Sequence, residues 1–275
     1  MKKLNPKNIV IIFILVILGV FFLMPIYFAV INSFKPLSEI VTSYTDFPKS
    51  FYLGNYIKAW IKTDFPRVFL NSLIITVISL SGIILISSMA GYILVRTPGK
   101  LSWLLFVIIV SSMIIPFHTI MIPLIVVTRK LNLSNSIPGI ILVYWGLGCN
   151  FAIFLYHGFV KTIPHELEES AVMDGCTPYQ TFFKIVMPLL VPVTSTIAVL
   201  DALWIWNDFL LPLLLLQRKA IQTIPLSQYI FFGQYYSDWG LALAGLILAV
   251  LPIVIFYIFM QKYIVKGITA GAVKS

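Results

Sequence analysis

The chain has 275 residues, of which 60% are hydrophobic and 11% are charged, and its formal net charge is +9. A soluble globular domain is usually about one quarter charged, and a fold of this length cannot hide so much apolar surface from water. Composition therefore excludes a soluble protein and indicates that lipid is the main solvent. The basic residues are scattered between apolar runs, so lipid head groups and topology control explain them better than nucleic-acid binding.

Six apolar runs are long enough to cross a bilayer, which requires a helix of about 20 residues. In chain order they are residues 9–31, 69–95, 101–128, 137–160, 185–216 and 241–260. The runs are too long and too evenly apolar to be the strands of a membrane barrel. We therefore predict an all-α, polytopic membrane protein with six transmembrane helices.

Six spans place both termini on one side of the membrane, and the distribution of lysine and arginine predicts which side. With the N-terminus inside, the inner segments carry ten of the nineteen basic residues and the outer segments carry nine. Five of those nine lie in the long connection 32–68, and the preference for basic residues on the cytoplasmic side is weaker in long loops. The basic residues next to the short inner ends therefore determine the predicted orientation. We expect both termini in the cytoplasm. We also expect the first run to be retained, because no small-residue cleavage site follows it.

Four of the ten acidic residues gather in ELEESAVMDG, residues 166–175, between the fourth and fifth runs. Pro164 can occupy the first turn of a short helix, and the early glutamates suit the positive end of its dipole. Leu167 and Ala171 are four residues apart and are expected to share a face with Ser170. This pattern predicts a short helix outside the membrane.

A second helix start follows this segment at once. Gly175 can end the first helix in a left-handed conformation. The sequence Thr177-Pro178-Tyr179-Gln180 matches a capping box with proline at the first helical position. A solvated helical loop would explain the acidic residues equally well, but not two helix signals in such close succession.

The segment EESAVMDGCTPYQTFFKIVMPLLVP, residues 168–192, resembles the conserved loop of ABC importer permeases, in which Glu-Ala-Ala precedes Asp-Gly and Ile-x-x-Pro. The corresponding residues here are Glu169, Ser170, Ala171, Asp174, Gly175 and the stretch 185–188. Small side chains, Ser170 and Cys176, stand where the family has alanine. WIWNDFLLPLLLL at 204–216 and KGITAGAVK at 266–274 resemble the carbohydrate-uptake branch, and in particular its shorter, maltose-type subunit.

The resemblance implies a permease subunit of an ATP-driven ABC importer for sugars or oligosaccharides in the bacterial plasma membrane, and not an enzyme. It implies that residues 164–176 form a cytoplasmic coupling helix between helices 4 and 5, with Glu169, Ser170, Ala171, Asp174 and Gly175 at the contact with a separate ATPase. The chain has no P-loop, so ATP and magnesium would be bound by that ATPase and no cofactor by this chain.

The partners implied by the resemblance are a second related permease in a heterodimer, a cytoplasmic ATPase dimer, an external solute-binding protein, the sugar and membrane lipid, with no nucleic acid. Three segments are expected: 1–66 with the first helix and an external loop, 67–262 as the permease transmembrane domain, and 263–275 as a cytoplasmic tail.

Two aspartates interrupt the fifth run, although a carboxylate at mid-bilayer costs about 2.5–3.5 kcal/mol on insertion scales. Asp201 and Asp208 are seven residues apart, so a continuous helix would place them on one face with Trp204 between them. One interpretation is a sugar pathway in which Trp204 stacks on a ring while Asn207 and Asp208 bond hydroxyl groups. The other is structural pairing with the second permease. The role of His118 stays open, and no spacing of His, Cys and Asp suggests a metal site.

Two alternative functions compete with sugar import. A permease for amino acids or peptides would share the loop at 168–192, but the tail and the 204–216 segment disfavour it. A secondary transporter acting alone would be expected to show internal repeats and ion-coupling residues on broken helices. The sequence shows no repeat, and Asp201 and Asp208 are the only acids within its apolar runs.

Overall fold

A computed structural model describes residues 6–232 and 238–272, and the elements in these ranges are all helices. The all-α prediction is therefore confirmed for the described part of the chain. This part divides into two compact units. The first contains the chain before Pro66 together with Ser227–Pro252, and the second contains Pro66–Leu226 with the chain from Ile253 onward.

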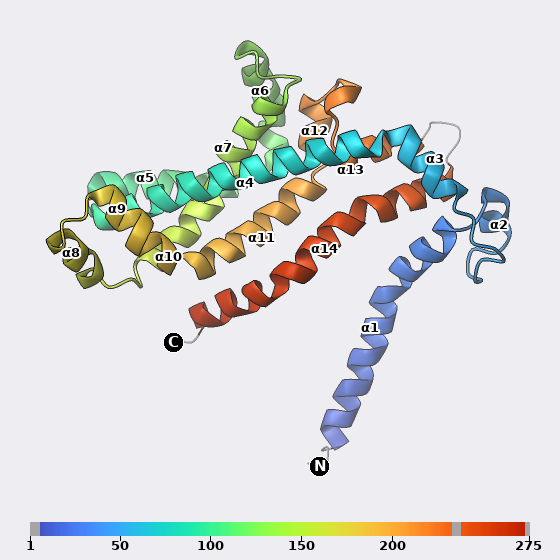
Figure 1. The fold of residues 1–275 in the computed structure, drawn as a ribbon, viewed down its shortest axis with the longest axis horizontal. Coiled ribbons are helices and arrows are strands. Elements are labelled where there is room, and N and C mark those ends of the chain that lie inside the picture. Colours follow the sequence, from blue (N-terminus) through green and yellow to red (C-terminus); the bar gives the residue numbers. More distant parts are fainter. Residues whose placement is uncertain (1–5, 233–237, 273–275) are drawn as a thin grey trace. The chain divides into compact units, whose positions relative to one another are not determined.

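The first unit contains one long N-terminal helix and a small core. Its elements are α1 (Pro6–Ser33), α2 (Leu37–Thr42), α3 (Gly54–Thr63), η4 (Tyr229–Phe231) and the first part of α14 (Trp239–Ala272) (Figure 1). The core joins Ala59 of α3 to Phe231 and Leu241. The apolar side chains of residues 10–27 of α1 are exposed, as Phe22 illustrates with 71% exposure, which is expected of a helix that faces lipid or another chain.

The structure describes most of the two predicted terminal segments, 1–66 and 263–275. Residues up to Phe65 of the expected N-terminal segment belong to the first unit. Helix α14 continues through Ala272, so most of the expected tail 263–275 is helical. Residues 273–275 lie outside the described residues.

The second unit contains the remaining helices and carries both candidate sites. Its elements are α4 (Phe65–Arg96), α5 (Lys100–Ser111), η1 (Ser112–Ile114), α6 (Phe117–Lys130), α7 (Ile137–Val160), α8 (Glu166–Met173), α9 (Pro178–Thr181), the π-helical turn η2 (Phe182–Val186), α10 (Met187–Leu189), α11 (Val191–Asn207), α12 (Leu210–Leu215) and η3 (Lys219–Ile221). Helix α13 (Ile224–Gln228) contains the boundary between the two units.

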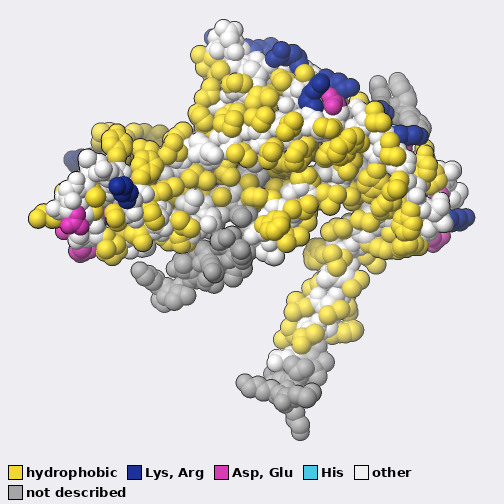
Figure 2. Space-filling view, in the orientation of Figure 1, with side chains coloured by type: hydrophobic (Ala, Val, Ile, Leu, Met, Phe, Trp, Pro, Cys, Tyr) yellow, Lys and Arg dark blue, Asp and Glu magenta, His cyan; other side chains and the backbone are white. Residues whose placement is uncertain are grey.

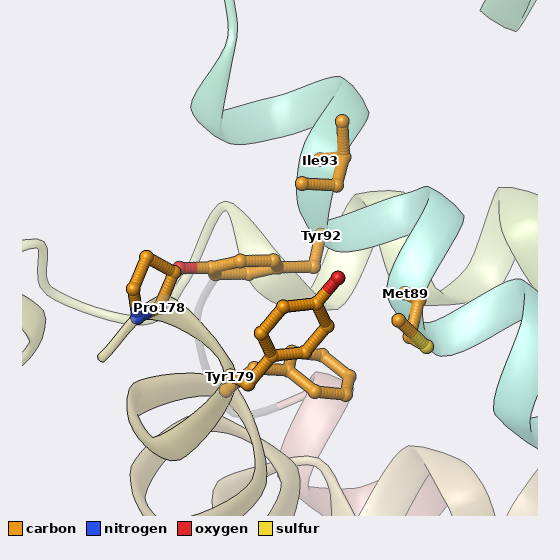
Figure 3. A pocket seen from close by; sticks show the side chains of 6 residues that line it. Met89, Tyr92, Ile93, Pro178 and Tyr179 are labelled. Atoms are coloured by element: carbon orange, nitrogen blue, oxygen red, sulfur yellow. The ribbon is translucent and has the colours of Figure 1, made fainter. Parts of the chain in front are cut away.

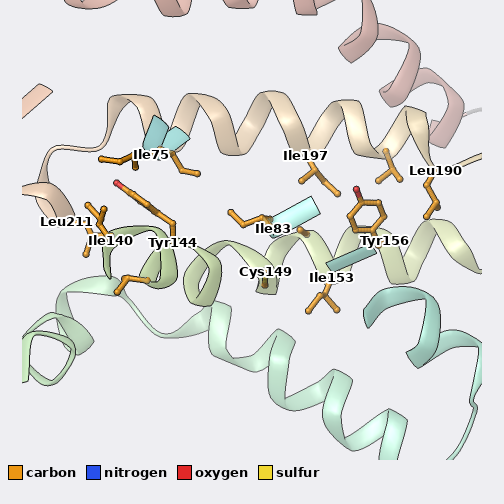
Figure 4. Close-up of a cluster of buried hydrophobic side chains, with 14 of the residues drawn as sticks. Ile75, Ile83, Ile140, Tyr144, Cys149, Ile153, Tyr156, Leu190, Ile197 and Leu211 are labelled. Carbon is orange, nitrogen blue, oxygen red and sulfur yellow. The ribbon is translucent and has the colours of Figure 1, made fainter. Parts of the chain in front are cut away.

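Two fully buried tyrosines of α7 mark the core of the second unit (Figure 4). The Tyr156 hydroxyl lies 2.9 Å from the Thr194 hydroxyl of α11, and the Tyr144 hydroxyl also makes a hydrogen bond, so neither polar tip is left unsatisfied. Helix α4 approaches α7 closely at Gly91, where an added Cβ would lie 2.8 Å from the Tyr156 Cβ. A larger residue at Gly91 would separate the two helices.

The third predicted span is sharply bent. Residues Lys100–Ile114 and Phe117–Lys130 meet at 107°. Pro116, at the N-cap of α6, has an extended ψ of 137° and no amide hydrogen, so the helix before it cannot continue through it. Run 101–128 therefore forms a bent pair of helices, which counts as one span only if the two helices are taken together.

The fifth predicted span is also bent, by 74° between Pro178–Leu189 and Val191–Asn207. Pro188 and Pro192 flank this break, and each lacks the amide hydrogen that would continue the helical ladder. The π-helical turn η2 ends at Val186, two residues before Pro188, as is common where the regular ladder is interrupted.

Four described helices are long and apolar enough to cross a membrane, and the number rises to six if each bent pair is one span. The membrane class is thus confirmed, whereas the count of six stays a prediction. Hydrophobic side chains cover much of the visible surface over α4 and α11, and carboxylates gather over α8 (Figure 2).

Candidate functional site

The first candidate site is the loop that contains α8, at the end of α4 that bears Arg96 (Figure 1). Helix α8 begins at Glu166 with His165 at its N-cap. Pro164 therefore precedes the helix instead of occupying its first turn, and that detail of the prediction is wrong. The three glutamates in the first turn lie where the helix dipole favours negative charge.

The end of α8 matches the predicted glycine stop. Gly175 has a φ of +84°, which confirms the left-handed conformation. Its amide donates to the Val172 carbonyl at 2.9 Å, and the Cys176 amide donates to the Ala171 carbonyl at 2.9 Å. These two bonds form a Schellman motif, which satisfies carbonyls that the end of a helix leaves free.

The second helix starts as the sequence predicts. The Thr177 hydroxyl accepts from the Gln180 amide at 3.3 Å, and the Gln180 side chain accepts from the Thr177 amide at 2.8 Å. The capping box is therefore confirmed. Since only Cys176 separates the Gly175 turn from this cap, the direction of the chain between α8 and α9 is fixed by backbone geometry and local hydrogen bonds.

Helix α8 has one buried side and one exposed side. Its buried residues are Ala171 and Glu168, which lies three residues earlier. Leu167 is 44% exposed, and Ser170 is also exposed. The buried side of α8 therefore follows Glu168 and Ala171, whereas the side chains of Leu167 and Ser170 are exposed.

The four acidic residues of the loop divide into one that points inward and three that are exposed. Glu168 is buried, whereas Glu166, Glu169 and Asp174 are exposed. Glu169 lies 3.2 Å from the His165 imidazole, and both side chains are more than half exposed. Three carboxylates thus remain accessible to another molecule.

Glu168 is fully bonded within the chain, and sequence reasoning gave it no separate role. Its Oε1 accepts from Arg96 Nη2 at 2.6 Å and from Arg96 Nε at 2.8 Å, and its Oε2 accepts from the Tyr92 hydroxyl at 2.7 Å. Arg96 Nη2 also donates to the Ile163 carbonyl at 3.0 Å. No local sequence signal set Glu168 apart from Glu169, because the partner of Glu168, Arg96, lies 72 residues earlier in the chain.

Tyr92 also lines two cavities beside the loop. One, of about 370 Å³, is almost wholly apolar and is lined by Met89, Tyr92, Ile93, Pro178, Tyr179 and Phe182 (Figure 3). The other, of about 570 Å³, lies along α8 and is lined by Tyr92, Arg96, His165, Glu168, Glu169, Val172, Met173, Pro178 and Thr181. The loop therefore offers both apolar and acidic surface.

The second candidate site lies where α11 ends. Helix α11 stops at Asn207, and Asp208 leaves it with an extended ψ of 126°. Asp201 is buried at 5% exposure, whereas Trp204 is 40% exposed. The predicted common helical face of Asp201, Trp204 and Asp208 is therefore wrong, because the helix ends before Asp208.

Asp208 is bonded to its own chain. Its Oδ1 accepts from the Leu210 amide at 3.0 Å and the Leu211 amide at 3.3 Å, at the start of α12. Its Oδ2 accepts from the buried Tyr144 hydroxyl at 3.0 Å. These three bonds give the carboxylate a structural role that neither sequence interpretation included.

Trp204 and Asn207 are the more accessible members of this group. The Trp204 ring meets Tyr144 edge-on with centroids 5.4 Å apart, which fixes the ring while leaving part of it exposed. Asn207 is exposed and bonds the Leu203 carbonyl at 2.8 Å through its Nδ2, so its amide oxygen is available to accept. An aromatic face beside an amide oxygen can stack on and bond a polyhydroxylated ligand.

Asp201 stands apart from both sites. Its Oδ2 is buried with no hydrogen-bond partner among the described residues. Across the described ranges, no group of three His, Cys, Asp or Glu residues could hold a metal ion.

Residues 82–270 match the family described as "Binding-protein-dependent transport system inner membrane component". A relative in Thermoanaerobacterium thermosulfurigenes, a probable starch degradation products transport system permease protein, AmyC, is 41% identical, and the match covers 100% of both chains. The multiple sugar-binding transport system permease protein MsmG of Streptococcus mutans serotype c is 36% identical over 93% of both chains.

The fold also occurs in a solved structure. A chain in the crystal structure of a bacterial ABC transporter involved in the import of the acidic polysaccharide alginate matches with a TM-score of 0.80 and 24% identity. The match covers 96% of this chain and 99% of that chain.

Proposed function

The chain belongs to the family of binding-protein-dependent transport system inner membrane components, and from this membership we propose that it is the permease subunit of an ABC importer for sugars or oligosaccharides. The names of two full-length relatives, which refer to starch degradation products and to multiple sugars, support a carbohydrate substrate. A solute such as an amino acid or a peptide is disfavoured by the same names.

The observation that carries the coupling part of the proposal is the construction of the α8 loop. Val172 is 57% exposed and Met173 is 87% exposed, beside the exposed carboxylates of Glu169 and Asp174. Apolar and charged side chains side by side on a short helix that ends in a Schellman motif are suited to a groove on another protein. In this proposal residues 164–176 dock on a cytoplasmic ATPase, which binds ATP and magnesium.

The complete transporter in this proposal contains a second, related permease, two ATPase subunits and an external solute-binding protein. The exposed apolar flanks of α1 leave surface for lipid and for the second permease. Both termini lie in the cytoplasm, on the same side as α8. The basic residues at the short ends, among them Arg96 and Lys100, support this orientation.

The sugar pathway in this proposal passes the end of α11. Trp204 stacks on a sugar ring, and Asn207 bonds a hydroxyl group. Asp208 contributes by fixing the turn between α11 and α12, because its oxygens are bonded to Leu210, Leu211 and Tyr144.

The coupling role is tested by reversing one exposed charge. Glu169→Lys should lower uptake by about 100-fold in cells that express the whole transporter, because mispairing a charge at a protein contact costs several kcal/mol. Lys161→Glu is the matched control, because it also reverses an exposed charge. Lys161 lies at the C-terminal end of α7, outside the proposed docking segment 164–176. Normal uptake in Glu169→Lys at normal membrane levels would contradict the proposal.

A further inference from the structure

Glu168 differs from the other acids of the loop because its side chain is 6% exposed, and its partner Arg96 is 14% exposed. Both carboxylate oxygens have donors: Arg96 binds Oε1 and Tyr92 binds Oε2. A partner protein therefore cannot use Glu168 without first breaking these bonds. The residue serves a contact within this chain.

A buried ion pair of this kind constrains geometry strongly. Removing two charges from water is costly, and the cost is offset only where the hydrogen-bond geometry is good. Here the guanidinium contacts Oε1 through two nitrogens at 2.6 and 2.8 Å, and the Tyr92 hydroxyl contacts the other oxygen at 2.7 Å. Rotation of α8 about its axis would break all of these contacts together.

Arg96 also holds the entrance to α8. Its Nη2 donates to the carbonyl of Ile163, in the turn between α7 and α8, at 3.0 Å. One guanidinium thus bonds both the approach to α8 and the middle of α8. Arg96 is the last residue of α4, a helix of 32 residues that is long and apolar enough to cross a membrane.

We propose that Tyr92, Arg96 and Glu168 form a latch that makes α8 move as one body with the end of α4, and that these three are positioning residues for energy coupling. The inference rests on the proposed function, because it assumes that α8 receives the movement of an ATPase. Without the latch, α8 would be held by its two chain connections and by its packing against α9 and the π-helical turn η2. A push on Glu169 and Met173 would then turn α8 without moving α4.

The latch is tested in the complete transporter, reconstituted in lipid vesicles with its ATPase and binding protein. The probe is the member of a panel of malto-oligosaccharides and raffinose-type oligosaccharides that the unaltered complex takes up. The quantity measured is sugar taken up per ATP hydrolysed, with ATPase retention on purification as the check of assembly. A merely structural role would alter assembly without altering this ratio.

Arg96→Gln and Glu168→Gln should each lower the ratio by about tenfold, within the range typical of coupling between sites, while the ATPase stays bound. The double variant should be no worse than either single variant, because the two residues act through one contact. Lys100→Gln is the control, since it neutralises an exposed cation close to Arg96 in the sequence. An unchanged ratio in both single variants, or a double loss equal to the product of the single losses, would overturn the latch.

If the single variants fail to assemble, Tyr92→Phe decides, because it removes one hydrogen bond and keeps the ring. It should lower the ratio by about two- to threefold, the equivalent of a modest hydrogen bond. An unchanged ratio in this variant would overturn the latch.

Glu169→Lys separates the two proposals. If it stops uptake while the latch variants behave normally, the latch is wrong and the ATPase contact stands. If Glu169→Lys also transports normally, the proposed docking of residues 164–176 on the ATPase fails, and the latch that rests on it fails too.

Discussion

In the α8 loop three of four carboxylates are exposed, whereas at the end of α11 the carboxylate of Asp208 is bonded to the backbone of α12 and to Tyr144. Both regions place acidic residues beside long apolar helices. The difference follows from the local chain: Glu166 and Glu169 lie in the first turn of α8 with exposed side chains, whereas Asp208 lies two residues before α12 and accepts from its first two amides. An acidic residue in an apolar protein therefore indicates a binding partner only if its carboxylate is not already bonded to nearby backbone amides.

The largest effect expected from this comparison is at Asp208. Asp208→Leu removes acceptors from the Leu210 and Leu211 amides and leaves the buried Tyr144 hydroxyl without its partner. The lost cap and the unsatisfied hydroxyl should together destabilise the fold by about 3 kcal/mol, seen as a lower melting temperature of the purified complex.

Asp201→Leu is the matched control, because one oxygen of Asp201 has no hydrogen-bond partner in the described structure. Its melting temperature should change little or rise. An equal fall in melting temperature in the two variants would contradict the comparison. It would mean that the bonds of Asp208 add no more stability than the carboxylate of Asp201, one oxygen of which has no partner in the described structure.

An intermediate effect is expected at the glycine turn. Gly175→Ala should destabilise the loop by about 1–2 kcal/mol, because φ there is +84° and the site is otherwise open. Gly158→Ala is the matched control, since Gly158 lies within α7, also has open space and has no positive φ. Protease cleavage within the loop should increase in the first variant alone, and similar behaviour of both would show that the turn is not needed.

The smallest effect is expected at the cap of α9. Thr177→Ala should cost about 1 kcal/mol, because it removes the acceptor of the Gln180 amide. Ser136→Ala removes the corresponding cap of α7, where the hydroxyl accepts from the Gly139 amide at 3.1 Å. Both should lower the melting temperature slightly, but Thr177→Ala alone should lower sugar uptake. Reduced uptake in both would indicate general destabilisation.

Local chemistry explains which parts of the site could be predicted from the sequence. Gly175 and the Thr177–Gln180 capping box act through neighbours a few residues away, so the two helix ends were predicted correctly. The direction of Glu168 could not be predicted in the same way. Its partner Arg96 lies 72 residues earlier, and no local rule distinguishes Glu168 from Glu169.

For the fold, too, some features could be predicted from the apolar runs and others could not. Hydropathy correctly identified the long helices α4, α7 and α14. It also concealed the breaks at Pro116 and between Pro188 and Pro192, because a run stays apolar across a bend. The end of α11 at Asn207 was hidden in the same way, although the Asn207-Asp208 pair is a typical turn and capping signal.

The most direct test of the central claim places a single cysteine on the exposed side of α8. Met173→Cys, in a chain with Cys149 and Cys176 replaced, puts the thiol where the native side chain is 87% exposed. Lys130→Cys, at the exposed end of α6 and on the opposite side in the proposed topology, is the control. A short thiol-to-amine crosslinker should join residue 173, and not residue 130, to the ATPase in the assembled transporter. An adduct at residue 130 alone, or none at residue 173 in an active complex, would contradict the coupling role of α8.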